Sequence, residues 1–235
     1  QAYQKSMKWG MTYGFIGAVL VIVLGHVQMQ YVMETQPMKA AAGEALWETE
    51  SPAGLSLFAT IDQEQHKNGI NLKLPAMLSF LAYNSFDAQC KGINAIQAEY
   101  VQKYGPGDYI PSVFWAYWMF RLMVGAGFLM LFIGIYVLMK TYKNKYDFSP
   151  RWLKILIWSL FLPLLGHSAG WLYAEIGRQP WAVFGLFKTS AGVSLATPAG
   201  NVLFSLLGYI VIYLLLIIAD VFLMKKYAIA GTEAL

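Results

Sequence analysis

Four long stretches of this sequence carry almost no charge, and they constrain the fold more than any other feature. Charged residues are absent from 9–33, 155–174 and 189–219, and residues 110–139 hold a single charge, Arg121. Each stretch can form a helix that crosses a bilayer, which takes about 20 apolar residues. We therefore predict an all-α integral membrane protein with four transmembrane helices. The predicted helices, within one membrane domain of residues 1–235, are 9–27, 111–139, 152–175 and 200–224.

Basic residues cluster beside the ends of these stretches, at three places along the chain. The clusters are Lys5 and Lys8; Lys140, Lys143, Lys145, Arg151 and Lys154; and Lys225 and Lys226. With four spans, all three clusters fall on one side of the membrane, and loops rich in lysine and arginine face the cytoplasm. We therefore predict a multi-pass membrane protein with both termini in the cytoplasm.

The connection at 28–110 then lies outside the cytoplasm, and it is too long for an ordinary loop. It holds nine acidic residues and five lysines. Pro37 precedes an alanine-rich segment, which predicts a helix that starts there. A second helical segment, residues 92–105, ends on Gly105 before a proline. Loops of this length usually carry function.

Composition excludes several classes of function. Charged residues make up only 13% of the chain, about half the share in soluble domains. The net charge of +4 comes from the clusters beside the spans, so it indicates topology and no nucleic-acid partner. The one cysteine, Cys90, excludes an intrachain disulfide, and phosphate-loop, H-E-x-x-H and G-x-S-x-G motifs are absent. Transport or redox chemistry within the membrane remains.

Two residues of the second stretch are candidates for a site. An ionisable group inside a membrane marks function by default, and Arg121 is such a group. It is either an internally paired or snorkelling arginine, or a counter-charge for a buried anion such as a haem propionate. Met123, two residues on, is either ordinary packing or a metal ligand. The small residues of 125–127 would admit a flat group or a close helix.

The third stretch has one polar and aromatic face. If the helix continues past Ala174, that face holds His167, Trp171, Glu175 and Arg178. Glu175 either forms an ordinary ion pair with Arg178 or meets a metal or a proton path. His167 is left without a role. In the fourth stretch Asp220 is expected at the membrane interface, with proton entry as the second option.

Three segments together resemble the large subunit of the cytochrome bd-type quinol oxidases. They are KAAAGEALWETESPAG (39–54), FRLMVGAGF (120–128) and WLYAEIGRQPW (171–181). The resemblance covers nearly the whole chain but only the C-terminal half of that subunit, in the form with a short quinol-binding loop. The chain is therefore expected to be a fragment of a longer polypeptide, or to act with an N-terminal half that is a separate chain.

The resemblance implies a role for each candidate residue. Met123 matches the methionine that ligates the low-spin haem b, and Glu175 matches the glutamate at the iron of the high-spin haem b. Lys39 and Glu44 match the loop pair implicated in quinol oxidation. Five residues apart, these two lie about 140° around a helix, so they do not share a face. The remaining matched residues line the haem region, and they are Arg121, Trp171 and Arg178.

The family also implies cofactors and partners that this chain does not complete. The N-terminal half would supply the histidine opposite Met123 and the histidine of haem d. Further partners are a second large membrane subunit, with or without a small single-span subunit. The predicted function is a respiratory terminal oxidase that oxidises membrane quinol, reduces dioxygen to water and contributes to the proton-motive force. The alternative is a four-helix transporter or channel subunit without redox activity, whose polar residues would line a pathway.

Overall fold

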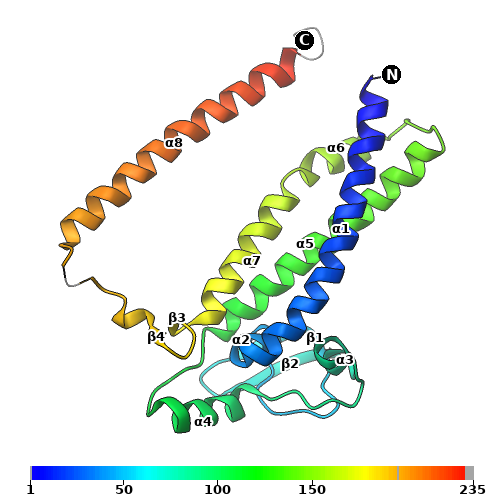
Figure 1. Ribbon diagram of the computed structural model, residues 1–235. Coiled ribbons are helices and arrows are strands. Elements are labelled where there is room, and N and C mark those ends of the chain that lie inside the picture. Colours follow the sequence, from blue (N-terminus) through cyan, green and yellow to red (C-terminus); the bar gives the residue numbers. More distant parts are fainter. Residues whose placement is uncertain (1, 195, 231–235) are drawn as a thin grey trace. The chain divides into compact units, whose positions relative to one another are not determined.

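The computed structural model describes residues 2–194 and 196–230, and these divide into two compact units between Ala191 and Gly192. Among the described residues, four helices are long and apolar enough to cross a membrane. They are α1 (Ala2–Thr35), α5 (Val113–Tyr142), the pair α6 (Pro150–Ser159) and α7 (Leu162–Arg178), and α8 (Ala199–Ala230). The four predicted spans are therefore confirmed. The second unit contains α8, and the other three spans belong to the first (Figure 1).

The third span is divided, which the sequence analysis did not anticipate. Helix α6 ends at Ser159, and α7 begins at Leu162 with Pro163 in its first turn. Proline lacks the N–H with which residue 163 would bond to the carbonyl of Ser159, the last residue of α6. Because that hydrogen bond cannot form, the helix is interrupted between Ser159 and Leu162. Helix α7 continues past Ala174 to Arg178, as the polar face of this span requires.

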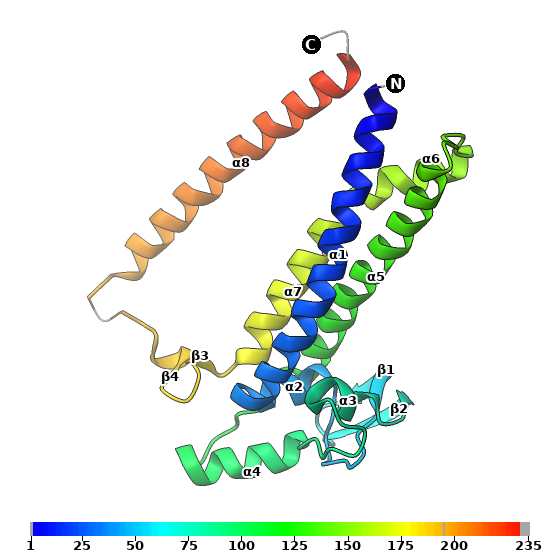
Figure 2. The same ribbon diagram turned by 45° about the vertical axis from the view of Figure 1, so that its right-hand side comes forward.

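Helices α5 and α7 pack side by side, and both views show α1 along α5 as well (Figure 2). Small residues permit the close approach of α5 and α7. A Cβ on Gly166 would lie 3.5 Å from that of Ala126, and a Cβ on Gly170 would lie 2.7 Å from the Met123 sulfur. Small residues are common where membrane helices meet, because they let the backbones approach.

The connection between α1 and α5, residues 36–112, is folded and is called the loop below. It contains α2 (Pro37–Gly43), β1 (Leu55–Asp62), β2 (Lys67–Leu74), α3 (Met77–Tyr83) and α4 (Ile93–Tyr104). Helix α2 begins at Pro37, and α4 ends before Gly105, whose φ is +93°. Both helix signals in the sequence are thus confirmed. The hydrophobic core of the loop joins α2, α4 and the start of α5. It includes Trp47, Ile93, Ile96, Tyr109 and Tyr117.

Two short antiparallel hairpins add to the predicted helices. Strands β1 and β2 pair from Leu55–Leu74 to Asp62–Lys67. A second hairpin follows α7 and consists of β3 (Trp181–Val183) and β4 (Phe187–Lys188). Its turn contains Gly185 at φ +73°, a conformation that glycine adopts without steric cost. The fold is mostly helical, as predicted, with these strands confined to the connections between spans.

Candidate functional site at the junction of the loop with helices α5 and α7

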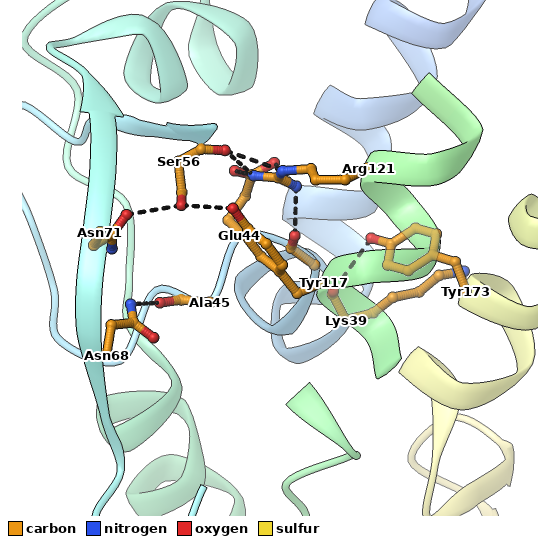
Figure 3. A network of polar contacts seen from close by, with 10 residues as sticks. Lys39, Glu44, Ala45, Ser56, Asn68, Asn71, Tyr117, Arg121 and Tyr173 are labelled. Atoms are coloured by element: carbon orange, nitrogen blue, oxygen red, sulfur yellow. Dashed lines mark hydrogen bonds and ion pairs between the residues drawn. The ribbon is translucent and has the colours of Figure 1, made fainter. Parts of the chain in front are cut away.

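Arg121 of α5 is held by the loop through all five of its N–H groups. Nε donates to the Ser56 carbonyl at 3.0 Å, and Nη1 donates to the Gly43 carbonyl at 2.7 Å and to Glu44 Oε1 at 3.4 Å. Nη2 donates to Glu44 Oε2 at 2.6 Å and also to the Ser56 carbonyl. The guanidinium carbon lies 4.3 Å from the centre of the Tyr117 ring. Figure 3 shows this network.

Of the two sequence-based interpretations of Arg121, the structure shows the internally paired arginine. No N–H of Arg121 is left for a haem propionate, because each donates to a loop oxygen. A contact with a haem would require one of these bonds to be exchanged. The role of Arg121 in cofactor binding therefore remains a prediction, and its observed role is to fasten the loop to α5.

Glu44 is the buried partner of Arg121, with its side chain 1% exposed. Burial raises the pKa of this carboxyl group, and the charge and hydrogen bonds of Arg121 oppose that rise. An ion pair in such surroundings needs every oxygen and N–H matched, because desolvating two charges is costly. The pKa of Glu44 is therefore set by two opposing effects, burial and the neighbouring charge of Arg121.

A second layer of buried polar groups supports the pair. The Ser56 hydroxyl donates to Asn71 Oδ1 at 2.8 Å and lies 3.0 Å from the Tyr117 hydroxyl. Tyr117 thus supports Arg121 with its ring and Ser56 with its hydroxyl. The sequence analysis missed Ser56, Asn71 and Tyr117, which lie in three elements and share no local motif.

Lys39 faces α7, whereas Glu44 faces α5, as their five-residue spacing predicts (Figure 3). The Lys39 carbonyl accepts a hydrogen bond from the Tyr173 hydroxyl at 3.2 Å, and the Lys39 ammonium lies 5.5 Å from the Tyr173 ring centre. Burial lowers the pKa of Lys39; the positive charge of Arg178 lowers it further, and Glu175 opposes both effects. The candidate quinol lysine therefore lies in the field of the Glu175–Arg178 pair.

Two glycines bring α2 and α7 together. A Cβ on Gly43 would lie 2.8 Å from the Tyr173 ring, and a Cβ on Gly177 would lie 2.8 Å from Lys39 Cγ. Tyr173, which the sequence analysis did not single out, occupies this contact and is buried. The only signal for it was its place within WLYAEIGRQPW, between Trp171 and Glu175.

Glu175 and Arg178 form an ion pair one helical turn apart, so the ordinary pairing proposed from the sequence is present. The face that they share with His167 and Trp171 is nevertheless open. Trp171 is 60% exposed and His167 is exposed as well. Within residues 2–194 and 196–230, no group of three or more His, Cys, Asp or Glu side chains could hold a metal ion.

Met123 lies half-buried between α5 and α7, and its sulfur packs against Gly170. In this structure Met123 therefore acts as a packing residue between the two helices. A methionine side chain has three rotatable bonds, so the direction of its thioether is not fixed by the backbone. The open, aromatic face of α7 beside this thioether would suit a flat, apolar group.

A family model for the cytochrome bd terminal oxidase subunit I matches residues 1–232 of this chain. The chain belongs to that family. It is 42% identical, over 98% of its length, to the cytochrome bd ubiquinol oxidase subunit 1 of Bacillus subtilis. It is 31% identical, again over 98%, to the cytochrome bd-II ubiquinol oxidase subunit 1 of Escherichia coli.

The bd family also supplies a structural relative, the bd oxidase from Geobacillus thermodenitrificans. That structure covers 94% of this chain with a TM-score of 0.75 and 29% sequence identity. This chain spans 50% and 56% of the two curated relatives and 48% of the solved chain. It therefore corresponds to about half of a bd subunit I. The resemblance inferred from three segments and the multi-pass membrane fold are both confirmed.

Proposed function

We propose that this chain contributes the quinol-oxidising site, and ligands for two haems, to a respiratory bd-type terminal oxidase. The observation that supports this most strongly is the contact of the loop with α5 and α7. Glu44 is bonded to the helix that carries Met123, and Lys39 lies against the helix that carries Glu175. Electrons released in the loop would have a short path into the helices, which a transporter or channel subunit would not require.

In this proposal the two loop residues make two separate polar contacts to the quinol. Lys39, a cation of lowered pKa, donates a hydrogen bond to a quinol oxygen. Glu44 accepts a proton, which its burial favours because burial raises the pKa of this carboxyl group. The proton then leaves on the outer face, where the basic clusters of the sequence place the loop. Protons for water formation enter from the cytoplasm.

The haems supply electron transfer and dioxygen reduction. Met123 would hold the low-spin haem b by its thioether, and Glu175 would approach the high-spin haem b by a carboxylate oxygen. Trp171 and Arg178 would lie beside the macrocycles, and the N-terminal half would complete haem d. The assembly would include a second large membrane subunit in a bacterial cell membrane, with both termini of this chain in the cytoplasm.

The enzyme that contains this chain can be tested directly after purification from its membrane. We expect a Soret band, and dioxygen consumption that depends on added quinol. Lys39→Ala should lose quinol-dependent consumption and keep the Soret band, because Lys39 touches no haem in this proposal. Lys103→Ala, in α4 of the same loop, is the matched control and should behave as wild type. A wild-type enzyme without a Soret band would instead support the transporter or channel subunit.

A further inference from the structure

An open pocket lies at the opposite end of α1 from the loop, where the start of that helix meets the connection between α5 and α6. That connection, residues 143–149, is called the link below, and both views show it beside the start of α1 (Figures 1 and 2). The volume of the pocket is about 490 Å³, within the roughly 300–1,000 Å³ of small-molecule sites. Its walls are Gln4, Lys5, Lys8, Asn144 and Tyr146.

The link is folded back onto α5, so one wall of the pocket has a defined shape. Trp152 of α6 stacks on Tyr136 of α5 at a centroid distance of 4.0 Å, and Phe148 of the link meets the same ring edge-on. The Lys140 ammonium donates a hydrogen bond to the Asp147 carbonyl at 3.0 Å and also pairs with the carboxylate of that residue. Asp147 is the only acidic residue of the link, and its charge is thus offset by Lys140.

The other wall belongs to α1, and one contact holds it against the end of α5. The Lys8 ammonium lies 4.3 Å from the ring centre of Tyr142, which is a cation–π contact. Lys8 is half-buried, whereas Lys5, one turn earlier, is exposed. The contact therefore fixes one positive charge at the pocket and leaves a second one beside it.

The walls of the pocket carry positive charge without a counter-charge. Among the ion pairs of the residues that the structure describes, none includes Lys5 or Lys8. Residues 1–33 contain no acidic residue. The remaining walls offer neutral donors, which are the amide groups of Gln4 and Asn144 and the hydroxyl of Tyr146. Two ammonium groups with neutral donors around them suit an anion with several oxygens, such as a phosphate group.

The place of the pocket on α1 indicates which kind of phosphate it would meet. Lys8 directly precedes the charge-free stretch 9–33, so the pocket lies at the boundary of the membrane. Trp9 and Tyr13 follow Lys5 one and two turns deeper, and their exposed rings stack at a centroid distance of 6.1 Å. Exposed Trp and Tyr side chains are typical of the headgroup level of a bilayer. A phospholipid would use this apolar surface, and a free phosphate ion would not.

We propose that this pocket binds the phosphate group of an anionic phospholipid, with Lys5 and Lys8 as the cations. Basic pockets between transmembrane helices on the cytoplasmic side bind anionic headgroups, and the basic clusters predict that side for this pocket. The bound lipid would join the start of α1 to the link, and so stabilise the packing of α1 on α5. The inference goes beyond the proposed function and involves neither haem nor quinol.

Native mass spectrometry of the purified holoenzyme, delipidated and titrated with phosphatidylglycerol, counts the bound anionic lipids and measures their affinity. The double variant Lys5→Gln with Lys8→Gln should lose one phosphatidylglycerol that the wild type binds. We expect the affinity of that site to fall about 30-fold, which is about 2 kcal/mol, or about 1 kcal/mol for each lysine. A wild-type count and wild-type affinity in this variant would overturn the proposal, as they would if another part of the enzyme covers the pocket.

Two controls show whether the pocket and the lipid are both required. Lys225→Gln with Lys226→Gln removes the same charge from the end of α8, on the same predicted side of the membrane, and should bind phosphatidylglycerol as the wild type does. An equal loss in both double variants would reject the pocket, because it would show a general effect of charge. Inorganic phosphate should not displace the lipid at equal concentration, and displacement would show a site for a soluble anion instead.

A further variant keeps the test decisive if the double lysine variant yields no holoenzyme. Asn144→Asp preserves the size of the side chain, and aspartate tolerates the positive φ of 53° at this position as asparagine does. It places a negative charge in the pocket, so it should also weaken the binding of phosphatidylglycerol, and wild-type binding would reject the site. Because no quinol is added, this result is independent of whether the proposed function holds.

Discussion

Replacing Arg121 with methionine should release the loop from α5 while keeping the volume and apolar character of a membrane helix. The change removes five hydrogen bonds and leaves Glu44 buried without its cation. Removing one partner of a buried ion pair costs about 3–5 kcal/mol. Since about 1.4 kcal/mol is a factor of ten, the population of loop-open molecules should rise by roughly two to nearly four powers of ten.

Limited proteolysis of the loop measures that population, because cleavage follows the open fraction when opening and closing are fast. The double variant Arg121→Met with Glu44→Gln provides the control. It removes both charges, so it should be cleaved much more slowly than Arg121→Met alone, with a coupling of about 1–3 kcal/mol. Equal cleavage of Arg121→Met and wild type would refute the conclusion that this pair fastens the loop.

Three further predictions concern topology and the haem ligands. A protease added to right-side-out vesicles should cut only within residues 36–112, and cleavage between Lys140 and Lys154 would overturn the orientation. Met123→Leu preserves volume, so the protein should fold while the low-spin haem b spectrum turns high-spin or disappears; an unchanged spectrum would return Met123 to packing. Glu175→Ala should lose the high-spin haem b signal and most dioxygen reduction, in protein that still inserts into the membrane. Full haem content and full turnover in this variant would show that Glu175 serves only as the ion-pair partner of Arg178.

Local patterns in the sequence predicted the parts of this fold that depend on local physics. Charge-free length identified the spans, Pro37 marked the start of α2, and Gly105 marked the end of α4. The β1–β2 hairpin was missed although Ile70, Leu72 and Leu74 alternate with polar residues. That alternation spans only residues 70–74, which is too short to distinguish a strand from an irregular connection.

The roles predicted for the candidate site residues stay predictions, and the contacts that the structure shows among these residues could not be predicted from the sequence. Arg121 and Glu44 are 77 positions apart, and Tyr173 lies 134 positions from Lys39. No periodicity links residues at such separations, so the sequence left Arg121 open between internal pairing and a haem counter-charge. The structure shows the internal pairing, because the Gly43 and Ser56 carbonyls lie within reach of the guanidinium, and the haem counter-charge stays a prediction.

The central claim is that electrons enter through the loop and pass to haems held by α5 and α7. Stopped-flow reduction of the haems by quinol, compared with reduction by dithionite, tests it most directly in the Glu44→Gln holoenzyme. This variant keeps the shape of the side chain and removes its base. We predict wild-type haem content and a wild-type dithionite-reduced spectrum, with haem reduction by quinol slowed by roughly 10²–10⁴-fold, which is the contribution of a positioned base. Haem reduction by quinol at the wild-type rate would contradict the account.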